Sequence, residues 1–182
     1  LIASVFAGCS KISLEGKWLS VIDLSNYVAE SWDMTDDPEI GQYYDKIDVK
    51  LTVDVIYTFD KKNNYTCAVD EEKLRADLDA LAEKVADYTS EGMYKYVEDN
   101  GESREEFKAY YEEENGINLY DDLYASAKED CDIIFSEVVK DFTETEMQLM
   151  GFEGDRIYQT DDNGNETGYQ TYILDGDTLT IT

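Results

Sequence analysis

The spacing of hydrophobic residues changes abruptly twice along this 182-residue chain, and no single regular element satisfies both spacings. Up to Val69 apolar and polar residues alternate, as they do in half-buried strands. From Asp70 to about Asp141 apolar residues recur every three or four positions, as in amphipathic helices. After Thr143 short alternating runs return. This order predicts an α+β fold in which a helical insertion over about 70–141 interrupts a β domain.

The first section contains one long alternating run with a shorter element before it. A short amphipathic helix or turn is expected over residues 24–32. Residues 61–64 are typical of a hairpin turn, and residues 65–69 of the returning strand. The residues expected to share one face of the long run are Val49, Leu51, Val53, Val55, Tyr57 and Phe59.

Three helices are expected in the middle section. Asp70 is a good N-cap, and the apolar seam of the first helix comprises Leu74, Leu78, Leu81, Val85 and Tyr88. Asn100-Gly101 ends that helix, and Ser103 with Glu106 forms a capping box for the second. Asn115-Gly116 ends the second helix, and the third carries Cys131 on its apolar side.

The last section predicts a meander of short strands. Two similar segments, residues 152–158 and 174–180, place Gly-Asp between apolar positions, which is typical of tight hairpins. Together with Gly16-Lys17-Trp18 on the first strand and the strand over 57–60, this order resembles the lipocalin-like domains of bacterial surface lipoproteins. The resemblance implies a small antiparallel β-barrel or curled sheet over residues 10–182. It also implies structural roles for Gly16 and Trp18, with Trp18 as a core plug at the barrel base.

The N-terminal segment carries a second resemblance. An apolar run over residues 1–7 closes on Gly8-Cys9-Ser10, which resembles the lipobox of a bacterial lipoprotein signal. Residues 1–9 would then be a signal-peptide remnant, with Cys9 carrying the lipid at a cell surface or a periplasm-facing membrane. An ordinary cleaved signal or an apolar strand are the alternatives.

Composition narrows the classes of function. The chain has 43 acidic and 15 basic residues, a net charge of −28, so nucleic acid is not an expected partner. It has no histidine, the commonest general base and transition-metal ligand. Among its many carboxylates no pair stands out as a glycosidase pair. We therefore expect no catalysis, no cofactor and no metal site.

Two cysteines and one polar loop are further candidates for a disulfide and a calcium site. Cys67 and Cys131 are expected to be small buried hydrophobes, with a disulfide between them as the alternative. The loop over residues 161–168 alternates Asp161, Asn163 and Asn165, but its glycine falls at the wrong position for a calcium loop. A plain hairpin loop is the better interpretation, with weak calcium binding as the lesser one.

The leading hypothesis is a lipid-anchored envelope protein that binds without catalysis. Its ligand would be a small apolar molecule, a glycan or an envelope partner. The lipobox, the barrel-like strand order and the absence of histidine favour this hypothesis, and the fifteen tyrosines suit sugar stacking and protein interfaces. The first alternative is a scaffold that docks another protein through an exposed seam of the helical insertion. The second is a carboxylate-dependent hydrolase, which requires two facing acids with one of them buried.

Overall fold

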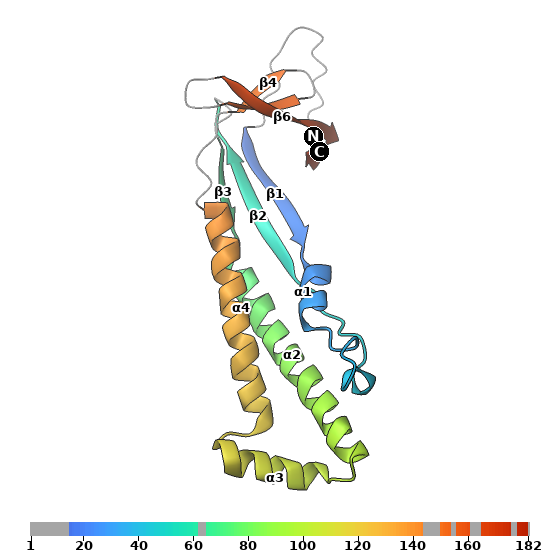
Figure 1. The fold of residues 1–182 in the computed structure, drawn as a ribbon. Helices are drawn as coiled ribbons and strands as arrows, with labels where there is room; N and C mark the ends of the chain where they lie inside the picture. The colour runs from blue at the N-terminus through green and yellow to red at the C-terminus, as the bar shows by residue number, and fades with distance from the viewer. Residues whose placement is uncertain are drawn as a thin grey trace. The chain divides into compact units, whose positions relative to one another are not determined.

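The computed structural model describes residues 15–61, 65–143, 150–153, 156–160, 165–175 and 178–181 (Figure 1). The fold is α+β, as predicted. Its helices are α1 (Ser25–Trp32), α2 (Glu71–Asp99), α3 (Arg104–Asn115) and α4 (Leu119–Thr143), with a 3-10 turn η1 (Gly41–Tyr43). Its strands are β1 (Gly16–Asp23), β2 (Thr52–Phe59), β3 (Tyr65–Val69), β4 (Met150–Glu153), β5 (Arg156–Thr160), β6 (Glu166–Asp175) and β7 (Thr178–Ile181).

The described strands form two open antiparallel sheets, ordered β1-β2-β3 and β4-β5-β6-β7. The second sheet is the predicted meander, and its two outer hairpins close on the pairs Glu153–Arg156 and Asp175–Thr178. Of the two forms expected, a small barrel or a curled sheet, the described strands do not form a closed barrel, because each sheet keeps two outer strands that pair on one side only. Helices follow β3 directly, so the first sheet gains no fourth strand from the next stretch of chain.

The chain divides into two compact units. Val21–Asp54 and Val69–Asp141 form the helical unit, which holds α1, η1, α2, α3 and nearly all of α4. The other unit, here the strand unit, holds the described strands β4 to β7 together with parts of β1, β2 and β3. Each unit is described by itself below.

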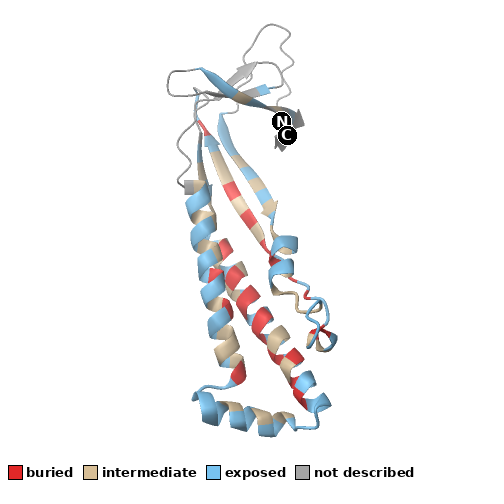
Figure 2. Ribbon diagram, viewed as in Figure 1, coloured by how far each residue is buried: buried red, intermediate tan, exposed pale blue. Residues whose placement is uncertain are grey.

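Helix α2 holds more buried residues than any other helix of the helical unit (Figure 2). Of its predicted seam, Leu74, Leu78, Leu81 and Val85 are buried and Tyr88 is half-buried. The other buried residues of the same helix are Ala82, Ala86, Ser90, Gly92, Tyr94 and Val97. Because α2 is covered on two sides while α3 buries no residue, α2 is the central element of this unit.

The helix boundaries follow the predicted signals. The Asp70 carboxylate accepts a hydrogen bond from Lys73 N at 3.0 Å, and Ser103 Oγ accepts one from Glu106 N at 3.1 Å. Gly116 ends α3 with a φ of 70°, in the left-handed region that glycine enters without strain. The long alternating run is confirmed as buried at Leu51, Val53 and Phe59, although the strand itself begins only at Thr52.

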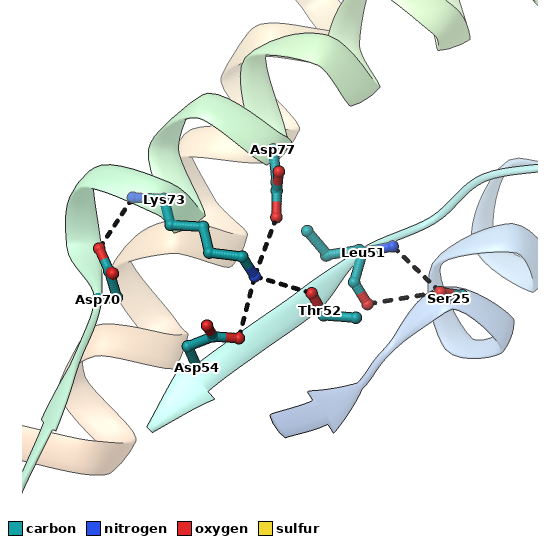
Figure 3. Close-up of polar contacts among 7 residues, drawn as sticks. All are labelled: Ser25, Leu51, Thr52, Asp54, Asp70, Lys73 and Asp77. Carbon is teal, nitrogen blue, oxygen red and sulfur yellow. Dashed lines mark hydrogen bonds and ion pairs between the residues drawn. The ribbon is translucent and has the colours of Figure 1, made fainter. Parts of the chain in front are cut away.

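A polar cluster joins β2 to the start of α2 (Figure 3). Lys73 Nζ lies 2.9 Å from Thr52 Oγ1, 3.0 Å from Asp54 Oδ1 and 3.5 Å from Asp77 Oδ2. The hydrogen bond to Asp54 raises the pKa of Lys73 above its ordinary value. The backbone adds a direct link, because Asp70 N donates to Asp54 O at 2.9 Å. One ammonium group therefore connects two strand side chains and two helix turns.

Leu51, the residue just before β2, holds α1 through its backbone. Ser25 Oγ accepts a hydrogen bond from Leu51 N at 3.1 Å and donates one to Leu51 O at 3.4 Å (Figure 3). Leu24 N also donates to Leu51 O, at 3.0 Å. Because Leu51 is fully buried, these bonds satisfy backbone groups that water cannot reach. The start of β2 therefore positions both α1 and α2.

Ion pairs link helices α2 and α4. Arg75 pairs with Asp132, and Lys128 pairs with Asp79. The Arg75 guanidinium also lies 3.6 Å from the centre of the Phe135 ring, a cation–π geometry. In a chain with so few cations, two of them thus hold these acidic helices together.

Candidate functional site

An open hollow of about 420 Å³ lies in the helical unit, between the extended segment 43–48 and α2. Its walls combine tyrosine rings with side chains of both charges. The residues that line it are Tyr43, Tyr44, Asp45, Lys46, Ile47, Asp48, Lys84, Asp87, Tyr88, Glu91, Gly92 and Lys95. Its volume is within the range of roughly 300–1,000 Å³ that ligand sites occupy.

The contact between Tyr44 and Gly92 sets the position of the outer wall. A Cβ atom built on Gly92 would overlap the Cδ1, Cε1 and Cζ atoms of the Tyr44 ring. The ring can therefore lie against the backbone of α2 only because residue 92 has no side chain. Tyr44 is buried, and its hydroxyl donates to Thr89 O at 3.3 Å. Burial raises the pKa of Tyr44.

Two further tyrosines continue the aromatic lining. The Tyr88 ring centre lies 5.1 Å from that of Tyr44, and Tyr88 Oη accepts a hydrogen bond from Met34 N at 3.1 Å. Tyr43 donates to Asp99 Oδ2 at 2.8 Å, and its ring meets the ring of Tyr96 edge to face at 5.4 Å. These bonds fix the rings before any ligand arrives, which lowers the entropy cost of binding.

A compact turn holds the chain just before the hollow. Asp37 Oδ1 accepts hydrogen bonds from Glu39 N at 2.8 Å and Ile40 N at 3.0 Å. The bonds from Ile40 and Glu39 lower the pKa of Asp37. Gly41 closes the turn where a Cβ atom would overlap Thr35 O, and its N–H donates to Asp37 O at 2.9 Å. The segment therefore enters the hollow from a fixed point.

Charges of both signs alternate along the hollow. Three of its residues are lysines (Lys46, Lys84, Lys95) and four are acids (Asp45, Asp48, Asp87, Glu91). Lys95 pairs with Asp45 at 3.4 Å, whereas Lys84 is exposed and forms no ion pair with the described residues. Glu91 pairs with Arg104 at 3.0 Å, so the exposed charges of the hollow without an ion pair to the described residues are Lys46, Asp48, Lys84 and Asp87.

Among the described residues, Gly16, Trp18, Cys67 and Cys131, which the sequence singled out, do not line this hollow. Cys9 and the loop residues 161–164 lie outside the described residues. Gly16 opens β1, and Trp18 is half-buried on the same strand, so its role as a core plug stays a prediction. No group of three or more acidic or cysteine residues within the described parts of the chain could hold a metal ion.

Sequence reasoning noticed the tyrosine excess but missed the partners that give it a site. Gly92 looks like a weak point in a helix, and only the Tyr44 ring explains it. Lys84 and Asp87 look like ordinary solvated positions. A glycine in the middle of a strong helical pattern, with an aromatic residue in a preceding extended segment, is the signal that could have pointed here.

No family model, curated protein or solved structure matches the chain. None of the helices in the described ranges has the length and apolar character needed to cross a membrane.

Both described cysteines are free thiols. Cys67 is half-buried, and its thiol lies 2.9 Å from Phe142 O, to which it donates. Cys131 is fully buried on α4, and this burial raises its pKa to about 11. The expectation of a small buried hydrophobe is confirmed for Cys131.

The Tyr44–Gly92 contact predicts that the effect of Gly92→Ala on the free energy of unfolding depends on whether the Tyr44 ring is present. Gly92→Ala should lower the free energy of unfolding by about 1–3 kcal/mol, because the new methyl group overlaps the ring. In a Tyr44→Ala background the same change should be neutral or should raise it by up to about 1 kcal/mol, since alanine favours helix. Urea unfolding of the four proteins measures both effects. A Gly92→Ala cost that is equal in the two backgrounds would show that the contact is absent.

The buried thiol predicts a loss of stability at high pH. An exposed Cys131 thiol ionises near its ordinary pKa of 9.0, whereas the folded protein keeps the proton to about 11. The unfolded state therefore binds fewer protons in this window, and the free energy of unfolding falls as pH rises from 9 to 11. In Cys131→Ala the decrease in the free energy of unfolding between pH 9 and 11 should be smaller by about 2 kcal/mol. Parallel pH profiles for the two proteins would contradict the assignment.

Proposed function

We propose that this chain is a lipid-anchored binding protein of the bacterial cell envelope, which holds its ligand in the hollow on α2 without catalysis. The observation that carries the proposal is the combination of fixed tyrosine rings and solvent-open charges in one hollow. Ligand sites characteristically combine a few oriented polar groups with aromatic surface. The lipobox resemblance at Cys9 supports the anchor.

The two sheets bear on the ligand class. A lipocalin-like carrier holds an apolar molecule inside a closed barrel, and the described strands form open sheets instead. We keep the curled-sheet form of the lipocalin-like hypothesis for β1 to β3, with the helices over 71–143 as its insertion. The binding site is proposed on that insertion, where the lining is polar and aromatic.

The alternative functions have less support. A scaffold was expected to expose the seam Leu74, Leu78, Leu81 and Val85, and all four are buried. A hydrolase was expected to bury one of two facing acids, and the buried polar residue among the described ones is Ser90. Binding in the hollow is therefore the function that we propose.

Lipidation at Cys9 predicts that substituting this cysteine moves the protein from the membrane fraction to the soluble fraction. In a bacterial host, the full chain with its signal should sediment with membranes, and Cys9→Ser should release most of it into the soluble fraction. Cys67→Ser is the matched control and should stay with the membranes. Fractionation with detection on immunoblots measures the distribution. Equal membrane association of the wild type and Cys9→Ser would contradict lipidation at Cys9.

The hollow predicts loss of envelope binding in one tyrosine variant. The full chain carrying Cys9→Ser should bind isolated cell envelopes of the organism that makes it. Adding Tyr43→Ala should weaken that binding about tenfold, because it removes one ring of the lining. Tyr110→Ala is the control, since Tyr110 is exposed on α3 and does not line the hollow. Equal losses in both variants, or no binding by the parent, would refute the proposed site.

A further inference from the structure

The hollow on α2 is lined so that a hydroxyl-rich, uncharged ligand matches it better than an ion does. We infer that the ligand is a neutral saccharide. This inference rests on the proposed function and names the chemical class of the ligand that the same site takes.

The mixture of charges in the hollow gives the first argument. Lysine ammonium groups only donate hydrogen bonds, and ionised carboxylates only accept them. The hollow presents three of the first and four of the second. Two of these carboxylates are already paired, Asp45 with Lys95 and Glu91 with Arg104. Two lysines (Lys46, Lys84) and two carboxylates (Asp48, Asp87) form no ion pair with the described residues, so an anionic ligand would pair with the two lysines but meet the two carboxylates, and a cationic ligand would meet the reverse. A sugar hydroxyl accepts from Lys84 and donates to Asp87 without either conflict.

The aromatic lining gives the second argument. Tyrosine rings offer apolar surface to the C–H faces of a sugar ring, and Tyr43 and Tyr88 are both partly exposed in the hollow. Their hydroxyl groups are already bonded to Asp99 and to Met34 N. The rings are therefore held in place by the protein, and their exposed surface is left for stacking.

The charge of the whole chain gives the third argument. At a net charge of −28 the protein repels anions over a Debye length or more, so an acidic glycan or a phosphorylated ligand approaches against the field. A cation is attracted by the same field to many other carboxylates on the surface, so this attraction does not favour the hollow over other places. A neutral ligand is selected by contacts within the hollow alone.

The first experiment titrates the full chain carrying Cys9→Ser with oligosaccharides of matched length and different charge. The neutral probes are oligomers of glucose, xylose, mannose and galactose, and the charged probes are oligomers of glucuronic acid and glucosamine. Isothermal titration measures affinity, and amide chemical shifts locate the site. We expect at least one neutral oligomer to bind more tightly than both charged ones, with the largest shifts at residues 43–48 and 84–92.

Single substitutions on α2 then test the two polar partners. Lys84→Ala and Asp87→Ala should each weaken binding of the neutral oligomer about tenfold, because each removes one hydrogen bond that involves a charged group. Glu83→Ala, next to Lys84 on the same helix and outside the hollow, should leave the affinity unchanged. All three side chains are exposed, so the fold is expected to tolerate each change. Equal effects of all three would overturn the assignment.

The outcomes separate the ligand class from the proposed site. Tighter binding of a charged oligomer, or no binding of any neutral one, overturns the saccharide inference. Suppose that binding to isolated envelopes then survives periodate oxidation of their sugars and is lost after protease treatment of the envelopes. If that binding also depends on Tyr43, the hollow binds a protein, and the proposed function stands without the saccharide inference. If neither envelopes nor oligosaccharides bind, both proposals fall. Envelope binding that periodate abolishes and protease leaves intact supports both.

Discussion

The packing of the Tyr44 ring against the backbone of α2 at Gly92 is the constraint on which the proposed site depends. Interiors pack too closely for an aromatic ring and a methyl group to share that space. The absence of one side chain therefore lets an extended segment without strand partners lie along a helix. The compact turn at Asp37 and Gly41 fixes the same segment from its other side. The hollow is thus bounded by a rigid helix on one wall and by a pinned segment on the other.

A second theme is how an acidic chain holds its helices together. Four cations link its elements through carboxylates: Lys73 at the start of α2, Arg75 and Lys128 between α2 and α4, and Arg104 at the corner between α2 and α3. Arg104 reaches Glu91 at 3.0 Å and Glu98 at 3.2 Å, and its guanidinium lies 4.7 Å from the centre of the Tyr94 ring. Exposed pairs of this kind contribute little singly, so their value here is in setting which helix faces meet. Lys84 takes part in no such pair with the described residues, which leaves it available in the hollow.

Local signals predicted the elements well, and long-range contacts account for what they missed. Asp70, Ser103 and Gly116 mark helix ends through bonds within a few residues, so the sequence alone predicts them. Whether the strands close into a barrel could not be predicted, because sheet closure depends on which distant strands pair, and alternation along one strand carries no information on its partner. The sequence did not predict the hollow for the same reason. Tyr44 and Gly92 are 48 positions apart, and neither is unusual among its sequence neighbours.

The measurement that tests this account most directly is the proximity of Tyr44 to Gly92 in solution. Nuclear Overhauser spectra of the full chain carrying Cys9→Ser should show cross-peaks between the Tyr44 ring protons and the Gly92 α-protons. The glycine signals should also be displaced by the ring current, because the ring lies directly against that backbone. Unshifted Gly92 signals with no cross-peak to Tyr44 would mean that the segment is not held on α2, and the hollow would lose its outer wall.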